Sequence, residues 1–242
     1  MDIAYEFKLP DGTERIFRIK LDPDSGLVEL DNQEDQNVPS WTELTFHQCP
    51  HCPLSATDSA QCPAAAAVEP LVEGFGQIKS YDEVQVTVRM PQRTVTSESK
   101  ADTAARSLMG LVMAGSGCPQ LSFFRPMARF HLPFADAEET AFRTIASYIL
   151  AMHLGQNHDA TGEEKVTIEA LTTIYEKIGT LNRAFIERLL AASDTDTNLN
   201  ALAELDVLAM SVPGSLEEMV GSLGPLFSDF LANMRSDVSQ PQ

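Results

Sequence analysis

Residues 47–53 are His47-Gln48-Cys49-Pro50-His51-Cys52-Pro53, and they hold two of the four cysteines of this 242-residue chain. The other two are Cys62 and Cys118, which gives the spacing C-x2-C-x9-C-x55-C with a proline after every cysteine. A C-x2-C turn brings two sulfurs onto one ion, and four thiolates in a tetrahedron suit zinc. The spacing therefore predicts one metal centre whose ligands are Cys49, Cys52, Cys62 and Cys118.

The two isolated cysteines stand where helices are expected to begin. Cys62-Pro63 and Cys118-Pro119 each place proline at the first helical position, which makes the cysteine the N-cap. The helix dipole and the free N–H groups at that end favour a thiolate. These positions could therefore offset part of the negative charge of a four-thiolate site.

The identity of the metal stays open between zinc, which would be structural, and an iron–sulfur cluster, which uses the same ligand set. His47 and His51 flank the C-x2-C turn and could replace a cysteine as ligand. Their alternative role is that of surface histidines in a turn. Two structural disulfides, or no metal at all, are the remaining alternatives for the four cysteines.

On the N-terminal side of the cysteines, apolar residues alternate with polar ones over 3–9 and 17–21, and Asp11-Gly12 supplies a hairpin turn between them. A further turn at 22–26 leads to a strand at 28–30, and a polar connection covers 31–40. We expect a short extended segment over 41–46, a helix from Pro63, and two more strands at 84–90 and around Val95.

On the C-terminal side the apolar period becomes helical. A helix is expected from about Thr103 until Gly115-Ser116-Gly117, and Asp136-Ala137-Glu138-Glu139 resembles a capping box that starts another. Apolar stripes over 171–189, 199–208 and 220–231 predict three further helices, the last capped at Ser215. Packing of such faces against each other explains the stripes without a binding groove.

Together these patterns predict an α+β protein: an N-terminal antiparallel β-meander and a C-terminal helical bundle, joined at the tetracysteine metal site. The β-rich part, with the C-x2-C turn, spans 1–98, the helical part spans 99–235, and 236–242 form a disordered tail.

Composition excludes several classes of function. Seventeen basic residues against thirty-five acidic ones give a formal charge of −18, which repels nucleic acid and anionic membrane surfaces. The sequence shows neither a secretory signal nor an apolar run of roughly 18 residues that would span a bilayer. We therefore expect a cytoplasmic protein, in whose compartment thiols stay reduced and clustered cysteines more often hold metal than form disulfides.

Cys49-Pro50-His51-Cys52 resembles the active-site tetrapeptide of the thioredoxin-fold disulfide oxidases. In that family the first cysteine starts a long helix, whereas here Pro53 and the polar run 55–59 disfavour one. The tetrapeptide is therefore interpreted as a metal-binding turn, with a Cys49/Cys52 dithiol kept as the alternative.

A second candidate site lies after Cys118. Arg125 and Arg129 are one helical turn apart and His131 follows, so the three are candidate anion-binding residues for a carboxylate or phosphate. Pairing of the arginines with acidic side chains across the domain interface is the alternative. No complete nucleophile–base constellation, phosphate loop or nucleotide fingerprint appears, so an enzyme is not favoured.

Four segments carry a resemblance to a known family: the hairpin start, residues 46–54, the Leu108-Met109-Gly110-Leu111 stretch, and 117–134. They resemble a bacterial family of unknown function with a CPxCP…CP…GCP cysteine pattern, and the resemblance implies no activity. We therefore expect a cytosolic metal-binding protein with a binding or regulatory role, whose partner is a protein or a small anionic ligand. The alternative is a redox protein that carries an iron–sulfur cluster or the dithiol.

Overall fold

The structure, a computed structural model, describes residues 1–30, 39–76, 78–156, 168–192 and 196–238. Most of the expected polar connection and the last four residues of the expected tail lie outside the described residues.

Within the described residues, five antiparallel strands form one sheet in the order β3-β2-β1-β4-β5. The expected strands are confirmed as β1 (Asp2–Lys8), β2 (Glu14–Leu21), β3 (Val28–Leu30), β4 (Glu83–Met90) and β5 (Arg93–Lys100). Gly12 has φ +84° in the first hairpin turn, a backbone conformation that glycine adopts without strain.

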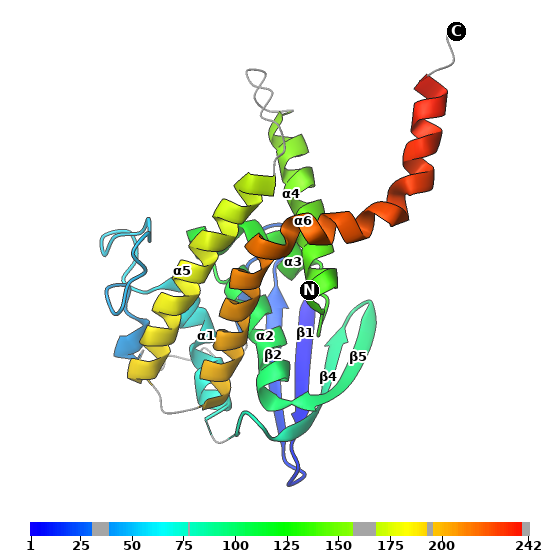
Figure 1. Ribbon diagram of the computed structural model, residues 1–242. Coiled ribbons are helices and arrows are strands. Elements are labelled where there is room, and N and C mark those ends of the chain that lie inside the picture. Colours follow the sequence, from blue (N-terminus) through cyan, green and yellow to red (C-terminus); the bar gives the residue numbers. More distant parts are fainter. Residues whose placement is uncertain (31–38, 77, 157–167, 193–195, 239–242) are drawn as a thin grey trace.

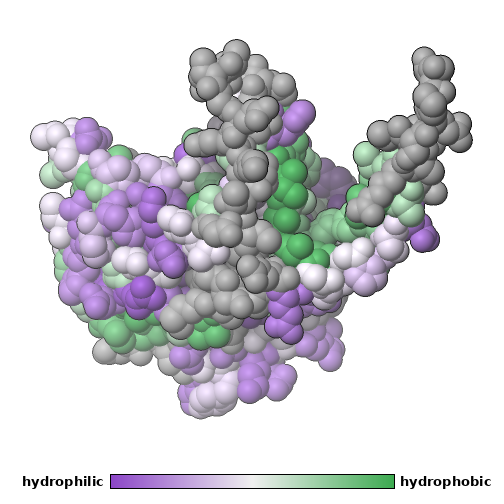
Figure 2. Space-filling model, turned by 45° about the horizontal axis from the view of Figure 1, so that its top comes forward, coloured by the Kyte–Doolittle hydropathy of each residue, from purple (hydrophilic) through white to green (hydrophobic). Residues whose placement is uncertain are grey.

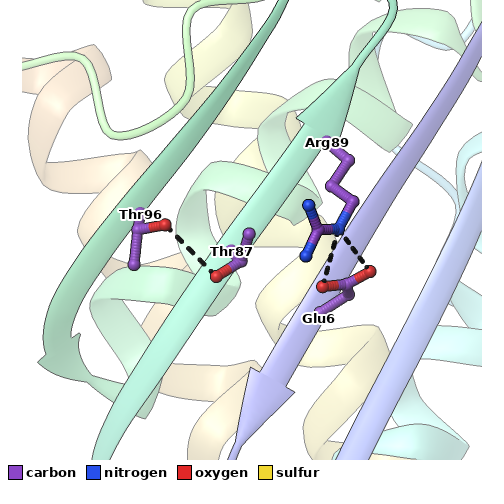
Figure 3. A network of polar contacts seen from close by, with 4 residues as sticks. All are labelled: Glu6, Thr87, Arg89 and Thr96. Atoms are coloured by element: carbon purple, nitrogen blue, oxygen red, sulfur yellow. Dashed lines mark hydrogen bonds and ion pairs between the residues drawn. The ribbon is translucent and has the colours of Figure 1, made fainter.

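The alternation of residues separates the two faces of this sheet. Ile3, Tyr5 and Phe7 of β1 are at most 1% exposed and lie on the core face. The opposite face carries polar pairs between strands (Figure 3): Arg89 of β4 forms an ion pair with Glu6 of β1 at 2.9 Å, and the hydroxyls of Thr87 and Thr96 lie 3.2 Å apart. The sheet is therefore covered by helices on one face only (Figure 1).

The helices nearest the sheet are α1 (Pro63–Gly74) and α2 (Ala101–Gly115). Alanines and Gly115 on the buried side of α2 allow a close approach, since a Cβ at Gly115 would lie 2.5 Å from the Val28 side chain. Then follow α3 (Arg125–Arg129), α4 (Ala137–Gln156), α5 (Ile168–Ala192) and α6 (Asp196–Val238), of which α5 and the first part of α6 pack side by side (Figure 1).

The capping box before α4 is confirmed. The Asp136 N–H donates to the Glu139 carboxylate at 3.0 Å, and the Glu139 N–H donates to the Asp136 carboxylate at 2.8 Å. The mixture of one antiparallel sheet and segregated helices confirms the α+β class.

Three expected elements differ from the structure. Residues 41–46 are not extended, because Ser40–Thr42 form a 3-10 turn closed by the Thr42 N–H on the Pro39 carbonyl at 2.9 Å. The expected helices over 199–208 and from Ser215 are one continuous helix, α6, of 43 residues. The same helix continues to Val238 and so includes residues 236–238, which were expected to belong to the tail.

The C-terminal segment of α6 projects from the body (Figure 1), and its described side chains are largely exposed. Exposed apolar residues of this segment include Leu226 and Phe230, at 76% and 62%, and α4 exposes Leu150 and Leu154. Figure 2 shows hydrophobic surface on the side from which this segment projects. In the described part of the chain, no helix combines the length and apolarity needed to cross a membrane.

Candidate metal centre

The chain around the C-x2-C turn forms a loop that leaves and returns at one place. The Cys62 N–H donates to the Thr42 carbonyl at 2.8 Å, and the Leu44 N–H donates to the Ala60 carbonyl at 2.9 Å. Residues 43 and 61 pair between these bonds as an isolated antiparallel bridge. We name residues 45–59 the cysteine loop, and Cys62 stands at its foot.

Within the cysteine loop, the Cys52 N–H donates to the Cys49 carbonyl at 3.0 Å, which closes the C-x2-C turn. Both side chains are half-buried and pack against the core. The Gln120 side-chain amide donates to the His51 carbonyl at 2.9 Å. Because Gln120 follows Cys118 closely, this bond joins the turn to the segment that carries the fourth cysteine.

Cys62 and Cys118 are the buried pair, each 8% exposed. As expected, both are N-cap residues followed by proline, Cys62 at α1 and Cys118 at a 3-10 helix (Pro119–Phe124) that runs into α3. The second helix is therefore shorter and more tightly wound than a full α-helix. Neither cysteine caps its helix through a side-chain hydrogen bond.

The four thiols lie close enough to influence one another's ionisation. Burial, and to a smaller extent the neighbouring Cys62, Cys118 and Cys52, together raise the pKa of Cys49 to about 12. Burial also raises the pKa of Cys118 to about 11, while the backbone N–H groups of Gln120 and Leu121 act in the opposite direction. All four cysteines are free thiols in this structure.

A charged residue that the sequence did not single out lies beside these thiols. Arg188 of α5 is 2% exposed, and its guanidinium donates to the carbonyls of Trp41, Glu43 and Leu44 at 2.6, 2.8 and 3.3 Å. Burial lowers the pKa of Arg188, and Cys62, Cys49 and Cys52 act against this. Arg188 thus ties α5 to the foot of the cysteine loop and supplies positive charge there.

Whether these residues fit a metal ion depends on chemistry and on spacing. The donor set suits zinc or an iron–sulfur cluster, and the Nε2 of His51 is buried with no hydrogen-bond partner among the described residues. In the part of the chain that the structure describes, no three or more His, Cys, Asp or Glu side chains stand in an arrangement that could hold a metal ion as it is. The donor chemistry fits, and binding would require the sulfurs to move closer together.

The three candidate anion-binding residues are not brought together. Arg125 and Arg129 both lie against the turn between β2 and β3, where the Arg129 guanidinium donates to the Pro23 carbonyl at 3.2 Å and Arg125 packs on Gly26. His131 lies elsewhere, with its Nε2 2.5 Å from the Tyr5 hydroxyl. The Tyr5–His131 contact was not foreseen, because 126 residues separate the two in sequence.

The structure is thus an α+β protein, with an antiparallel sheet that helices cover on one face. Its four free thiols lie at a cysteine-rich junction, where the cysteine loop meets those helices. The family model described as "Domain of unknown function (DUF6901)" matches residues 3–228. The chain therefore belongs to the DUF6901 family. No match is found among curated proteins or among solved structures. The resemblance to a family of unknown function is confirmed, while its cysteine pattern stays a prediction.

Proposed function

We propose that this chain is a metal-binding protein with a binding or regulatory role, in which Cys49, Cys52, Cys62 and Cys118 hold a structural zinc ion. The observation that carries the proposal is the gathering of four free, mutually interacting thiols from three separate segments of the chain. Such a set is the ligand set of structural zinc sites. A compartment that keeps thiols reduced, such as the cytoplasm, belongs to the same proposal.

The chain's own residues would position and neutralise the site. The bridge between residues 43 and 61 fixes the foot of the cysteine loop, and the Gln120–His51 bond holds the loop against the segment of Cys118. Arg188 places a guanidinium near three of the four sulfurs. Zinc binding would release the thiol protons, offset the repulsion between the resulting thiolates and draw the sulfurs together, so that metal binding and local folding would be coupled.

The redox alternative has one observation in its favour, because Cys49 and Cys52 are less buried than the other two cysteines. A dithiol active site requires a cysteine whose pKa is lowered, however, and the pKa of Cys49 is raised by burial. An iron–sulfur cluster would use the same four cysteines as zinc.

Metal analysis and absorption spectra of the full chain, purified without chelators under reducing conditions, separate these functions. The proposal expects colourless protein with about one zinc per chain. Brown protein that contains iron and sulfide and absorbs at about 400 nm would show that the four cysteines hold an iron–sulfur cluster and not zinc. Metal-free protein that takes up no added zinc, but forms a reducible Cys49–Cys52 bond, would overturn the metal proposal in favour of the dithiol.

A further inference from the structure

A cavity of about 240 Å³ lies among α2, α3, α4, α5 and the first part of α6. Its wall is mainly apolar, and includes Gly110, Leu111, Phe124, Met127, Ile178 and Leu205. A cavity of about 150 Å³ already admits benzene, so this one has room for a small organic molecule. The stretch from Phe124 to Ala137 supplies much of the wall, which gives that stretch a use other than the anion site expected from Arg125 and Arg129.

A chain of hydrogen bonds fixes one polar part of this wall. The Phe134 N–H donates to the Ser107 hydroxyl oxygen at 3.1 Å, the Ser107 and Tyr5 hydroxyls lie 2.8 Å apart, and the Tyr5 hydroxyl lies 2.5 Å from His131 Nε2. Burial, with a smaller contribution from Arg143, lowers the pKa of His131 to about 3. The ring is therefore neutral, and its Nε2 shares a hydrogen bond with the Tyr5 hydroxyl.

A second polar group of the wall has no partner. Asn182 of α5 is 3% exposed and lines the cavity, and it forms no hydrogen bond with the residues that the structure describes. Its amide atoms are not completely enclosed, so their hydrogen-bonding capacity is accessible from the cavity. A ligand with a polar group at this point would supply the missing hydrogen bond.

The charge of the wall indicates which polar group. Arg143 lines the cavity, and its Nη2 donates to the carbonyls of Met127 and Phe130 at 3.0 and 2.8 Å, while Glu139, which is not part of the wall, is the nearby acidic group. Arg106 lies on the same wall. The acidic residue of the wall, Asp136, already accepts the capping bond from Glu139. The wall is thus positive in a chain whose formal charge is −18.

We propose that this cavity binds a small carboxylic acid with an apolar body, whose carboxylate meets Asn182 and the arginine-lined part of the wall while the body fills the apolar part. An amide N–H and a guanidinium are the donors that a carboxylate requires. The apolar body gains from leaving water. This site is separate from the four cysteines and does not depend on the metal proposal.

Calorimetric titration of the full chain with octanoate, and in parallel with 1-octanol, tests the proposal. Octanoate is expected to bind at one site per chain and to raise the melting temperature, and 1-octanol is expected to bind at least about tenfold more weakly, because it lacks the charge. Equal affinity for the two compounds, or no octanoate binding at millimolar concentration, would overturn the proposal.

Two variants place the binding in this cavity. A Cβ at Gly110 meets only ordinary contact with Leu205 at 3.8 Å, so Gly110→Ala is the control that leaves room, and Gly110→Leu is expected to weaken octanoate binding at least about tenfold by filling the cavity. Asn182→Leu is expected to weaken octanoate binding about tenfold, because it removes the amide donor that meets the carboxylate. Unchanged octanoate affinity in either folded variant would contradict the assignment.

Discussion

Arg188 shows why a residue in an apolar stripe can be essential to a fold. It lies three positions after Phe185 on the face of α5 that also carries Leu181, so its side chain turns toward the core. A charge in that position is costly unless it is hydrogen-bonded, and the three carbonyls at the foot of the cysteine loop supply that bonding. The sequence offered the signal, a cation on a buried face, but it could not name the acceptors, which lie about 145 residues away.

Arg188→Leu is expected to lower the free energy of unfolding by about 3 kcal/mol or more, because it leaves three carbonyls without their donor. Lys177→Leu, at an exposed position of the same helix, is the matched control and should cost less than about 1 kcal/mol. Urea unfolding of both variants checks this, and equal losses would contradict the structural role of Arg188.

The buried neutral state of His131 makes stability depend on pH. Burial lowers the pKa of His131 to about 3, whereas the unfolded chain titrates near 6.5. Between these values the unfolded state binds more protons than the folded state, so the contribution of this residue to stability rises with pH. It is complete above about pH 6.5 and declines as the pH falls toward 3, by about 1.4 kcal/mol per unit.

Unfolding free energies measured from pH 7 to pH 4 check this dependence when wild type is compared with His131→Gln, which retains an acceptor for Tyr5 but cannot gain a proton. The difference between the two proteins is expected to shift in favour of the variant as the pH falls. His153→Gln, at an exposed position, is the control for the loss of a histidine elsewhere in the chain. Parallel curves for wild type and His131→Gln would show that His131 does not titrate on unfolding.

At the scale of elements, periodicity and turn chemistry predicted the five strands, α1, α2, α4 and α5, because each has its own local signals. The largest error was in α6, where the capping pattern at Ser215 predicted the start of a separate helix. The backbone stays helical through this region. A proline removes one hydrogen bond and bends a helix without necessarily ending it, and the pattern alone cannot distinguish the two outcomes.

The two parts of α6 are expected to differ in their contribution to stability. Leu202 in the first part is fully buried, and Leu202→Ala should cost about 2–5 kcal/mol through lost burial and the cavity left behind. Phe230 in the projecting segment is 62% exposed, so Phe230→Ala should change stability by less than about 0.5 kcal/mol. Thermal unfolding of the two variants measures this contrast, and a large loss for Phe230→Ala would mean that the segment packs against the folded body.

At the scale of the whole molecule, the cysteine loop and the helical part meet at a junction that the sequence located only in part. The C-x2-C turn and the two N-cap cysteines that precede proline indicated which four residues lie at the junction. The bridge at the foot of the loop, the Gln120–His51 bond and Arg188 are contacts between distant segments, and no local pattern encodes them. The same limit hid the cavity, because its wall comes from helices that are far apart in sequence.

The most direct test of the metal proposal is the zinc content and melting temperature of Cys118→Ser beside wild type, with Ala56→Ser in the exposed part of the cysteine loop as control. If the four cysteines share one structural ion, Cys118→Ser should lose most of its zinc and melt about 10 °C lower, and a chelator should lower the melting temperature of wild type but not that of the variant. Unchanged zinc content and melting in Cys118→Ser would contradict a centre that joins the cysteine loop to the helical part.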